Sequence, residues 1–500
     1  MKKHRWHLAF LTLLASIAIF VSCSGDKGNN PNYGGNGFSS SFSSSEDVEL
    51  SSSSEDVEPS SSSEDVEQSS SSEDVEPSSS SEDVEQSSSS EVVEPSSSSE
   101  VVEPSSSSKI EPSSSSEVTV NFTIKSPYAS INWDSYGQYK AALHTHTTNS
   151  DGTRSVLDVV DKYYELDYDI LAITDHTWKR IIDPRNPQVE VYKNFITKSW
   201  TATSWDGKTN WTTDGETYYL SYITGTRLTE VTTGVGRGGK KMLAIPNTGE
   251  LALQPGSDEI NVFYYTIAAP TAWTSSATIA NETKKASDAG ALVYLNHPGR
   301  ATGGRYDAAE SNKAANIKKY ADLTTNNSNV TGMEIFNRRD GDSKNDRILW
   351  DNVLTDIIPK GRYLWGFGGD DSHSHSEINV NHVMLLMPSN TDDNFKKAMK
   401  EGHSYTRARV AYNEGVDVPT DSPLPFPSIK KIEVNDKTGT ITITAEDFTK
   451  IEWISKGVKV AEGATLQVGD YPGIDIYVRA NIIGPGGIAL TQPFGIVKPK

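Results

Sequence analysis

A serine- and glutamate-rich repeat covers residues 39–117 and restricts any folded core to the rest of the chain. A typical unit reads Ser-Ser-Ser-Ser-Glu-Asp-Val-Glu-Pro, and a glutamate recurs every nine residues from Glu46 to Glu100. A segment of this composition has almost no apolar surface to offset the conformational entropy that folding removes, and its like charges repel one another. We therefore predict that residues 24–117 form a disordered, extended linker.

The linker also carries most of the negative charge of the sequence. The chain has 46 basic and 67 acidic residues and a formal net charge of −21. Nearly all of this excess lies between Glu46 and Glu117, so the part from Val118 onward is only slightly acidic. A groove for single-stranded nucleic acid needs a basic surface with stacking aromatic side chains. Because the part from Val118 onward is slightly acidic, nucleic acid ranks second, after a small ester substrate, among the expected partners.

Residues 1–23 have the features of an export signal of the lipoprotein type. A basic start precedes an apolar run from Leu8 to Val21, which is short for a membrane-spanning helix. Cys23 follows at the position that is lipidated in bacterial lipoproteins; an ordinary cleaved signal with an incidental cysteine is the alternative. We predict an exported protein, on the outer surface or in the periplasm of a bacterial cell, with a lipid anchor to the membrane at Cys23.

Residues 118–425 alternate short apolar strands with helical segments. A strand at 139–145, a helix at 155–166 and a strand at 169–174 form a βαβ unit, which favours a parallel sheet. Repetition of this unit predicts an α/β barrel with its functional groups where the strands end. Further strands are expected at 241–245, 291–295, 332–336 and 363–368, and a helix at 309–320.

Two other segments differ from this pattern. Residues 178–222 are polar and rich in Trp and Tyr, and we interpret them as an insertion over the barrel mouth whose aromatic side chains either contact substrate or pack among themselves. Residues 426–500 contain alternating strands separated by Gly, Asp and Asn turns, which predicts a small all-β domain of sandwich type.

Histidines and carboxylates gather at the predicted strand ends. In His144-Thr145-His146 two imidazoles lie two residues apart, so they point to the same side of an extended strand. Asp371 and His373 repeat that spacing after another apolar strand. A lone histidine is usually a surface or core residue, but two such pairs favour a shared metal ion. Cys23 is the only cysteine, so nitrogen and oxygen atoms must hold any ion.

The ordered set of these motifs resembles the polymerase and histidinol phosphatase (PHP) domain over about residues 139–412. The matching segments are His144-Thr145-His146 with Ser150-Asp151-Gly152, Ile173-Thr174-Asp175-His176, His297-Pro298, and Gly369-Asp370-Asp371-Ser372-His373. The resemblance implies a distorted (β/α)7 barrel, two or three divalent metal ions and phosphoester hydrolysis as the commonest activity.

A narrower resemblance is to the CehA/McbA-like branch of this superfamily. That branch carries a C-terminal β domain and includes hydrolases of carboxylic and carbamic esters. The segments that carry the resemblance are Met333-Glu334-Ile335-Phe336-Asn337, Leu349-Trp350-Asp351, Tyr477-Val478-Arg479 and Thr491-Gln492-Pro493.

The PHP resemblance implies a ligand set for the ions. The first ion would take His144, His146, Asp371 and a bridging glutamate; the second would take Asp151, His176 and His373; the third would take His297 and the bridging glutamate. Glu250 is the favoured bridging residue, and Glu230 is its competitor. Glu259 occupies a place where the family often has a histidine, so a dinuclear centre is the alternative to a trinuclear one.

Such ions activate water near neutral pH and neutralise charge that develops in the transition state. Asp371 and His373 are therefore catalytic candidates as well as ligands. Arg300, with Arg338 or Arg339, is a candidate to bind a phosphate or carboxylate, and a plain surface position is the alternative for these arginines. The nitrogen and oxygen donors admit Zn, Mn or Fe. Three further histidines match no ligand motif: His375, His382 and His403. For His403 the alternatives are a surface position and a place in the substrate pocket.

These observations favour a metal-dependent phosphoesterase that acts on a small phosphomonoester, phosphodiester or nucleotide. The alternatives are a 5′-3′ exonuclease, a hydrolase of carboxylic or carbamic esters, and a non-catalytic surface protein whose β domain binds glycans or other proteins.

Overall fold

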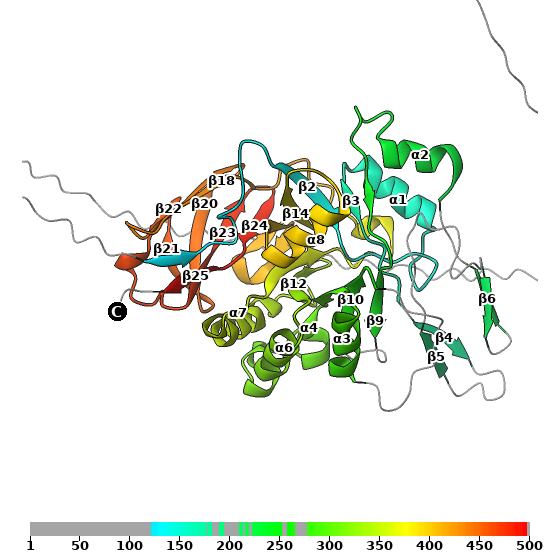
Figure 1. Ribbon diagram of the computed structural model, residues 1–500, viewed down its shortest axis with the longest axis horizontal. Helices are drawn as coiled ribbons and strands as arrows, with labels where there is room; N and C mark the ends of the chain where they lie inside the picture. Colours follow the sequence, from blue (N-terminus) through cyan, green and yellow to red (C-terminus); the bar gives the residue numbers. More distant parts are fainter. Residues whose placement is uncertain are drawn as a thin grey trace, which may run out of the picture. The chain divides into compact units, whose positions relative to one another are not determined.

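The computed structural model describes residues 122–176, 223–252, 258–265 and 278–497 (Figure 1). It also gives the backbone of two hairpins in the predicted insertion, β4 (Trp178–Ile182) with β5 (Glu190–Asn194) and β6 (Asn210–Thr213) with β7 (Glu216–Tyr219). The predicted signal, Cys23, the linker at 24–117 and the side chains of the insertion lie outside the described residues.

Two sheets dominate the described part of the chain. The larger one has 11 strands. Nine of them follow the order β1 (Thr123–Lys125), β25 (Phe494–Val497), β23 (Tyr477–Gly484), β24 (Gly487–Thr491), β15 (Ser404–Ala408), β14 (Asn381–Met387), β2 (Gly137–Ala142), β3 (Ile170–Leu171) and β8 (Leu243–Ala244), and β20 (Lys450–Ser455) with β21 (Val458–Glu462) branches from β23. The smaller sheet has the order β13 (Trp365–Gly369), β12 (Val330–Asn337), β11 (Leu292–Leu295), β10 (Glu259–Phe263) and β9 (Gly249–Ala252).

The two sheets meet where their strands end. The pairs β2–β3 and β3–β8 are parallel, as are β11–β12 and β12–β13, whereas β10 is antiparallel to both of its neighbours. Isolated parallel bridges join Thr145 to Ser372 and His176 to Glu250. The first bridge joins the segment after β2 to the segment after β13, and the second joins the segment after β3 to β9. The α/β class predicted from the sequence is confirmed, with a mixed rather than purely parallel sheet.

Helices pack beside the smaller sheet and at the end of the larger one (Figure 1). α1 begins at Val156 because the Ser155 hydroxyl accepts a hydrogen bond from the Asp158 amide, and its apolar side is buried. The expected helix at 309–320 is two helices separated at Asn312 and Lys313. The helices are α1 (Val156–Glu165), α2 (Gly225–Thr233), α3 (Ile279–Asp288), α4 (Pro298–Thr302), α5 (Ala308–Ser311), α6 (Ala314–Asn326), α7 (Asp346–Ile357) and α8 (Asp392–Glu401). Within the described ranges, none of them has the length and apolar composition needed to cross a bilayer.

The C-terminal strands are hydrogen-bonded to the part of the chain that precedes them. β18 (Ser428–Asn435), β19 (Thr440–Glu446) and β22 (Thr465–Gln467) form a separate sheet, but β24 pairs with β15 and β25 pairs with β1. Between Ser428 and Val497 the chain forms strands and one short 3-10 helix, Val468–Asp470. Strands from both sides of residue 425 pair in the larger sheet, and a domain boundary at that residue stays a prediction.

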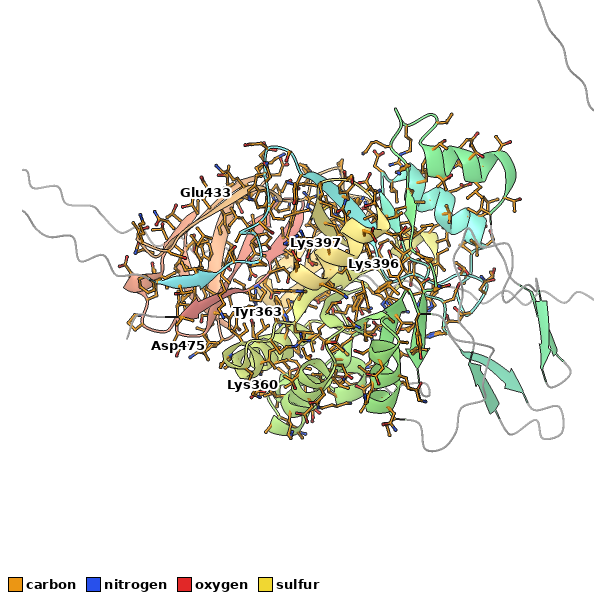
Figure 2. All side chains as sticks on the ribbon, viewed as in Figure 1. Lys360, Tyr363, Lys396, Lys397, Glu433 and Asp475 are labelled. Carbon is orange, nitrogen blue, oxygen red and sulfur yellow. The ribbon has the colours of Figure 1, made fainter. Side chains whose placement is uncertain are left out.

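A buried ion pair reinforces this connection. Asp351 on α7 accepts hydrogen bonds from Arg479 Nε at 2.9 Å, Arg479 Nη2 at 2.8 Å and the Tyr477 hydroxyl at 2.7 Å, and both charged side chains are at most 4% exposed. Near the same boundary, Tyr363 and Asp475, which are labelled in Figure 2, are among the residues that line a cavity of about 370 Å³. The C-terminal strands are therefore joined to the preceding part of the chain through polar contacts with α7 as well as through the pairing of strands in the larger sheet.

We expect Arg479→Met to lower the stability of the protein by about 3–5 kcal/mol, because it leaves the Asp351 carboxylate buried without its partner. Thermal or urea unfolding measures this loss. Lys456→Met breaks an exposed ion pair with Asp475 and serves as the control, with a change of at most about 1 kcal/mol. The double variant Asp351→Leu, Arg479→Met should recover most of the stability. A single Arg479→Met variant as stable as the control would contradict this account.

Candidate metal centre

Nine imidazole and carboxylate groups converge where the two sheets meet. They fall into overlapping groups in which the ligand atoms lie within 4.8 Å of one another. Together these groups contain every metal ligand predicted from the sequence: His144, His146, Asp151, His176, Glu250, Glu259, His297, Asp371 and His373. The convergence follows from the fold, because these residues lie at or just beyond the ends of β2, β3, β9, β10, β11 and β13.

The Glu250 carboxylate lies at the centre of this cluster. Its Oε1 atom is 3.2 Å from His144 Nε2 and 3.3 Å from His297 Nε2. Its Oε2 atom is 3.0 Å from His176 Nδ1 and 3.4 Å from His146 Nε2. Glu250 is therefore within reach of every ion that these histidines could hold.

The competing glutamate lies elsewhere. Glu230 is on α2, partly exposed, where it accepts a hydrogen bond of 3.0 Å from Arg227 Nη1. No group of candidate ligands among the described residues contains it. The structure thus places Glu250, and not Glu230, between the imidazoles.

Two aspartates extend the cluster on its other sides. Asp371 Oδ1 is 3.1 Å from His146 Nε2 and 3.5 Å from His144 Nε2. Asp151 Oδ2 is 3.2 Å from His373 Nε2 and 3.5 Å from His176 Nε2. The first aspartate is buried, whereas the side chain of Asp151 is half exposed. The cluster therefore opens to the surface on the side of Asp151.

These separations fit divalent ions. Two ligand atoms that each lie about 2.0–2.1 Å from one ion, at octahedral or tetrahedral angles, are roughly 2.9–3.4 Å apart. The Nε2 atoms of His144 and His146 are buried, point at carboxylate oxygens and make no hydrogen bond with any described residue. Buried polar atoms normally have partners. Ions coordinated by these atoms would supply them.

The charges of the cluster also favour bound cations. Burial raises the pKa of Glu250, but the neighbouring His144 and His176 outweigh it and hold that pKa well below its usual range. Burial and the adjacent Glu250 carboxylate raise the pKa of Glu259 to about 7. Two buried carboxylates this close repel each other unless a positive charge lies between them.

A buried glutamate outside the predicted set orients the ligands. The Oε1 atom of Glu334, on β12, lies 3.1 Å from His144 Nδ1. The same atom accepts a 2.8 Å hydrogen bond from the Tyr294 hydroxyl. Its Oε2 atom accepts hydrogen bonds from the His297 amide and from Asn337 Nδ2. This carboxylate aims the other nitrogen of His144 at the cluster. The sequence signal for this role is a charged residue inside a mostly apolar strand.

Asp175 supports the loop that carries Asp151. It accepts hydrogen bonds from the Thr147 amide at 2.6 Å, the Thr147 hydroxyl at 2.7 Å and the Ser150 hydroxyl at 2.7 Å. The carboxylate next to His176 therefore fixes the loop and is absent from the groups of candidate ligands.

Two of the three candidate arginines face the cluster. Arg300 Nη2 and Arg338 Nε donate to the same atom, Asp371 Oδ2, at 2.7 and 3.1 Å, and Arg338 Nη2 is 3.1 Å from His373 Nδ1. Arg339 instead pairs with Asp417 at 2.6 Å. Arg338 and Asp371 have φ angles of 47° and 46°, in the left-handed region that non-glycine residues seldom adopt. Both are therefore held in place by the structure around them.

The remaining histidines lie outside the cluster. His403 is buried, 3.1 Å from the Ser130 hydroxyl, so it is not at the surface. His382 is also buried, against Phe426, and His375 begins a short 3-10 helix, η2 (His375–Glu377). None of the three belongs to a group of candidate ligands in the described part of the chain.

We expect Glu259→Gln to bind one metal ion fewer per chain than the wild type. The third ion would be held by His297, Glu250 and Glu259, and the substitution removes one of its two carboxylates. Elemental analysis of the purified protein measures the ion content. Glu282→Gln on α3 is the matched control, since Glu282 is equally buried and, among the described residues, forms its ion pair with Lys285 outside the ligand groups. An unchanged ion content in Glu259→Gln would indicate that Glu259 is not a ligand.

Comparison with known proteins gave matches among solved structures only. A scan against protein-family models and a search of curated proteins found no match. A two-domain protein from Bacteroides vulgatus that contains a predicted PHP-like metal-dependent phosphoesterase has 12% identity and a TM-score of 0.36, with 73% of this chain and 89% of that chain covered. PsfC from Pseudomonas syringae has 14% identity and a TM-score of 0.28, with coverage of 51% and 85%. A candidate metal-dependent phosphoesterase from Bifidobacterium adolescentis has 13% identity and a TM-score of 0.27, with coverage of 52% and 96%. Two of these three neighbours are thus described as metal-dependent phosphoesterases, one of them as a predicted PHP-like one.

Proposed function

We propose that this protein is a metal-dependent hydrolase of the PHP type that cleaves phosphoesters. The observation that carries this proposal is the position of the Glu250 carboxylate among four imidazoles, each with a nitrogen 3.0–3.4 Å from one of its oxygens. A structural histidine cluster has no need of a shared carboxylate in this position, whereas a centre with two or three ions does.

Each proposed ion can be assigned to one set of ligands. One ion would be held by His144, His146 and Asp371, and a second by Asp151, His176 and His373, which also lie within ligand distance of His146. A third would be held by His297, Glu250 and Glu259, with Glu250 shared, because His297 Nε2 lies 3.3 Å from an oxygen of each glutamate. Zn, Mn and Fe all suit such donors. Bound ions would supply Lewis acidity and a water made acidic enough to attack an ester near neutral pH.

The arginines favour a phosphoester among the possible esters. Arg300 and Arg338 place two guanidinium groups at the edge of the cluster, on the Asp371 carboxylate. Their remaining N–H groups can donate to the oxygens of a phosphate, and their charge offsets its negative charge. A carboxylic or carbamic ester carries no such charge in its ground state and gains less from this arrangement. Asp371 and His373 are the proposed catalytic groups beside Arg300.

The finer features of fold and location belong to the same proposal. The two bridged sheets support a distorted (β/α)7 barrel, and the C-terminal strands support a sandwich-like β part of the kind found in the CehA/McbA-like branch. Residues 1–23 support export with a lipid anchor at Cys23, and the linker at 24–117 would then hold the hydrolase away from the membrane.

We expect radiolabelled fatty acid to be attached covalently to the wild type and not to the Cys23→Ser variant.

We expect the purified protein to contain at least two ions per chain and to hydrolyse p-nitrophenyl phosphate or bis-p-nitrophenyl phosphate faster than a 5′-phosphorylated oligonucleotide. His144→Ala should lower kcat/KM by more than about 100-fold, since loss of a residue that only supports a ligand already costs about 10–100-fold. His375→Ala, which changes a histidine outside the ligand groups, is the control. Protein that folds but contains no metal would refute the proposal.

Removal of the ions should destabilise the protein, because the buried carboxylates Glu250, Glu259 and Asp371 then lose their counter-charges. An ion present at about 100 times its dissociation constant contributes about 2.7 kcal/mol to the stability. Thermal unfolding with and without a chelator measures the effect, and added Zn or Mn should reverse it. A melting temperature that does not respond to the chelator, in protein shown to be metal-free, would count against a shared metal centre.

A further inference from the structure

A row of alternating charges leads from the metal centre to the protein surface. Arg300 Nη2 donates to Asp371 at 2.7 Å, and Arg300 Nε donates to Asp342 Oδ2 at 2.9 Å. The other oxygen of Asp342 is 3.5 Å from Arg305 Nη1, and Arg305 Nη2 hydrogen-bonds to the hydroxyl of Tyr306. The contacts are continuous from a candidate metal ligand to an aromatic ring.

Exposure increases along this row. The Asp371 side chain is 2% exposed, the Arg300, Asp342 and Arg305 side chains are 20–31% exposed, and Tyr306 is 77% exposed. Tyr306 is the most exposed large hydrophobic residue in the described part of the chain. The Arg305 guanidinium lies 4.4 Å from the centre of its ring. The row therefore begins at the floor of the site and ends on an open aromatic face.

The segment that carries Tyr306 has a fixed path. It leaves the metal ligand His297 through α4, and the Arg305 amide donates to the Gly299 carbonyl at 3.2 Å. The Gly304 carbonyl accepts a 2.7 Å hydrogen bond from Asn345. At Gly299 a Cβ atom would lie 2.7 Å from the Asp346 carboxylate, so only glycine fits there. The ring is thus presented by a short segment tied to the rest of the fold.

We infer that this row is the subsite for the leaving group and that it selects a leaving group with a planar aromatic ring carried on a spacer, as in a nucleoside. This inference rests on the proposed phosphoester hydrolysis. The phosphate would lie at Arg300 and Arg338, the spacer would extend past Asp342 and Arg305, and the ring would stack on Tyr306. Hydrolysis breaks the bond between phosphorus and the ester oxygen; water supplies the new oxygen on phosphorus and a proton for the released hydroxyl.

Adenosine 5′-monophosphate and ribose 5-phosphate test this inference, because they share the phosphate and the spacer and differ only in the ring. We expect the wild type to prefer the adenosine compound by about 5–100-fold in kcat/KM, the range that stacking of one base on an aromatic side chain gives. The preference should arise mainly in KM, because stacking contributes equally to the bound ground state and to the transition state. Phenyl phosphate carries its ring directly on the ester oxygen, without a spacer. Its kcat/KM should therefore exceed that of ribose 5-phosphate by less than the kcat/KM of the adenosine compound does.

Tyr306→Ala should abolish the preference and leave the hydrolysis of ribose 5-phosphate unchanged, whereas Tyr306→Phe should keep it. Phe448→Ala, which changes another exposed ring in the C-terminal part, should have no effect. The inference is overturned if the metal-loaded wild type hydrolyses both compounds equally well, or if Tyr306→Ala slows both equally. A wild type that binds no metal and hydrolyses no ester would overturn the proposed function itself.

Discussion

The position of the Glu250 carboxylate is the constraint on which the rest of the site depends. Both of its oxygens face imidazoles from different strands, and its own strand, β9, is joined to the end of β3 by the bridge between His176 and Glu250. Burial by itself would keep this group neutral, so the ionised form exists only because the surrounding groups supply positive charge. The fold brings the strand ends together, and this one carboxylate then determines how the ligands pair and why the cluster requires cations.

The C-terminal strands take part in the same construction. The β24 strand continues the sheet that contains β15, β14 and β2, and the end of β2 carries His144 and His146. The Gln492 side chain donates to the Gly366 carbonyl and accepts from the Gly366 amide, so it pairs with β13 as a neighbouring strand would. Because β13 leads directly to Asp371, the C-terminal part contributes to the frame that holds the candidate ligands.

Local sequence signals identified the candidate ligands but not the contacts that organise them. His144, His146, Asp371 and His373 follow short apolar strands at fixed spacing, and this is a local pattern. The choice between Glu250 and Glu230 depends on strand pairing between residues far apart in the chain, which no local pattern encodes. Contacts between residues far apart in the chain also determine the orienting role of Glu334, the burial of His403 and the pairing of β24 with β15. Local patterns thus predict the α/β class, whereas the connections between the elements depend on tertiary contacts.

The double hydrogen bond to Asp371 has a consequence for its strength as a ligand. Two guanidinium groups draw electron density toward Oδ2, so Oδ1, which faces His144 and His146, becomes a weaker base than an unpaired carboxylate. A weaker base transfers less charge to a cation. A cation beside Asp371 would therefore stay more electrophilic, and would be exchanged more readily, than one beside Glu250, whose Oε1 atom accepts a hydrogen bond from the neutral amide of Asn296 and none from a guanidinium among the described residues.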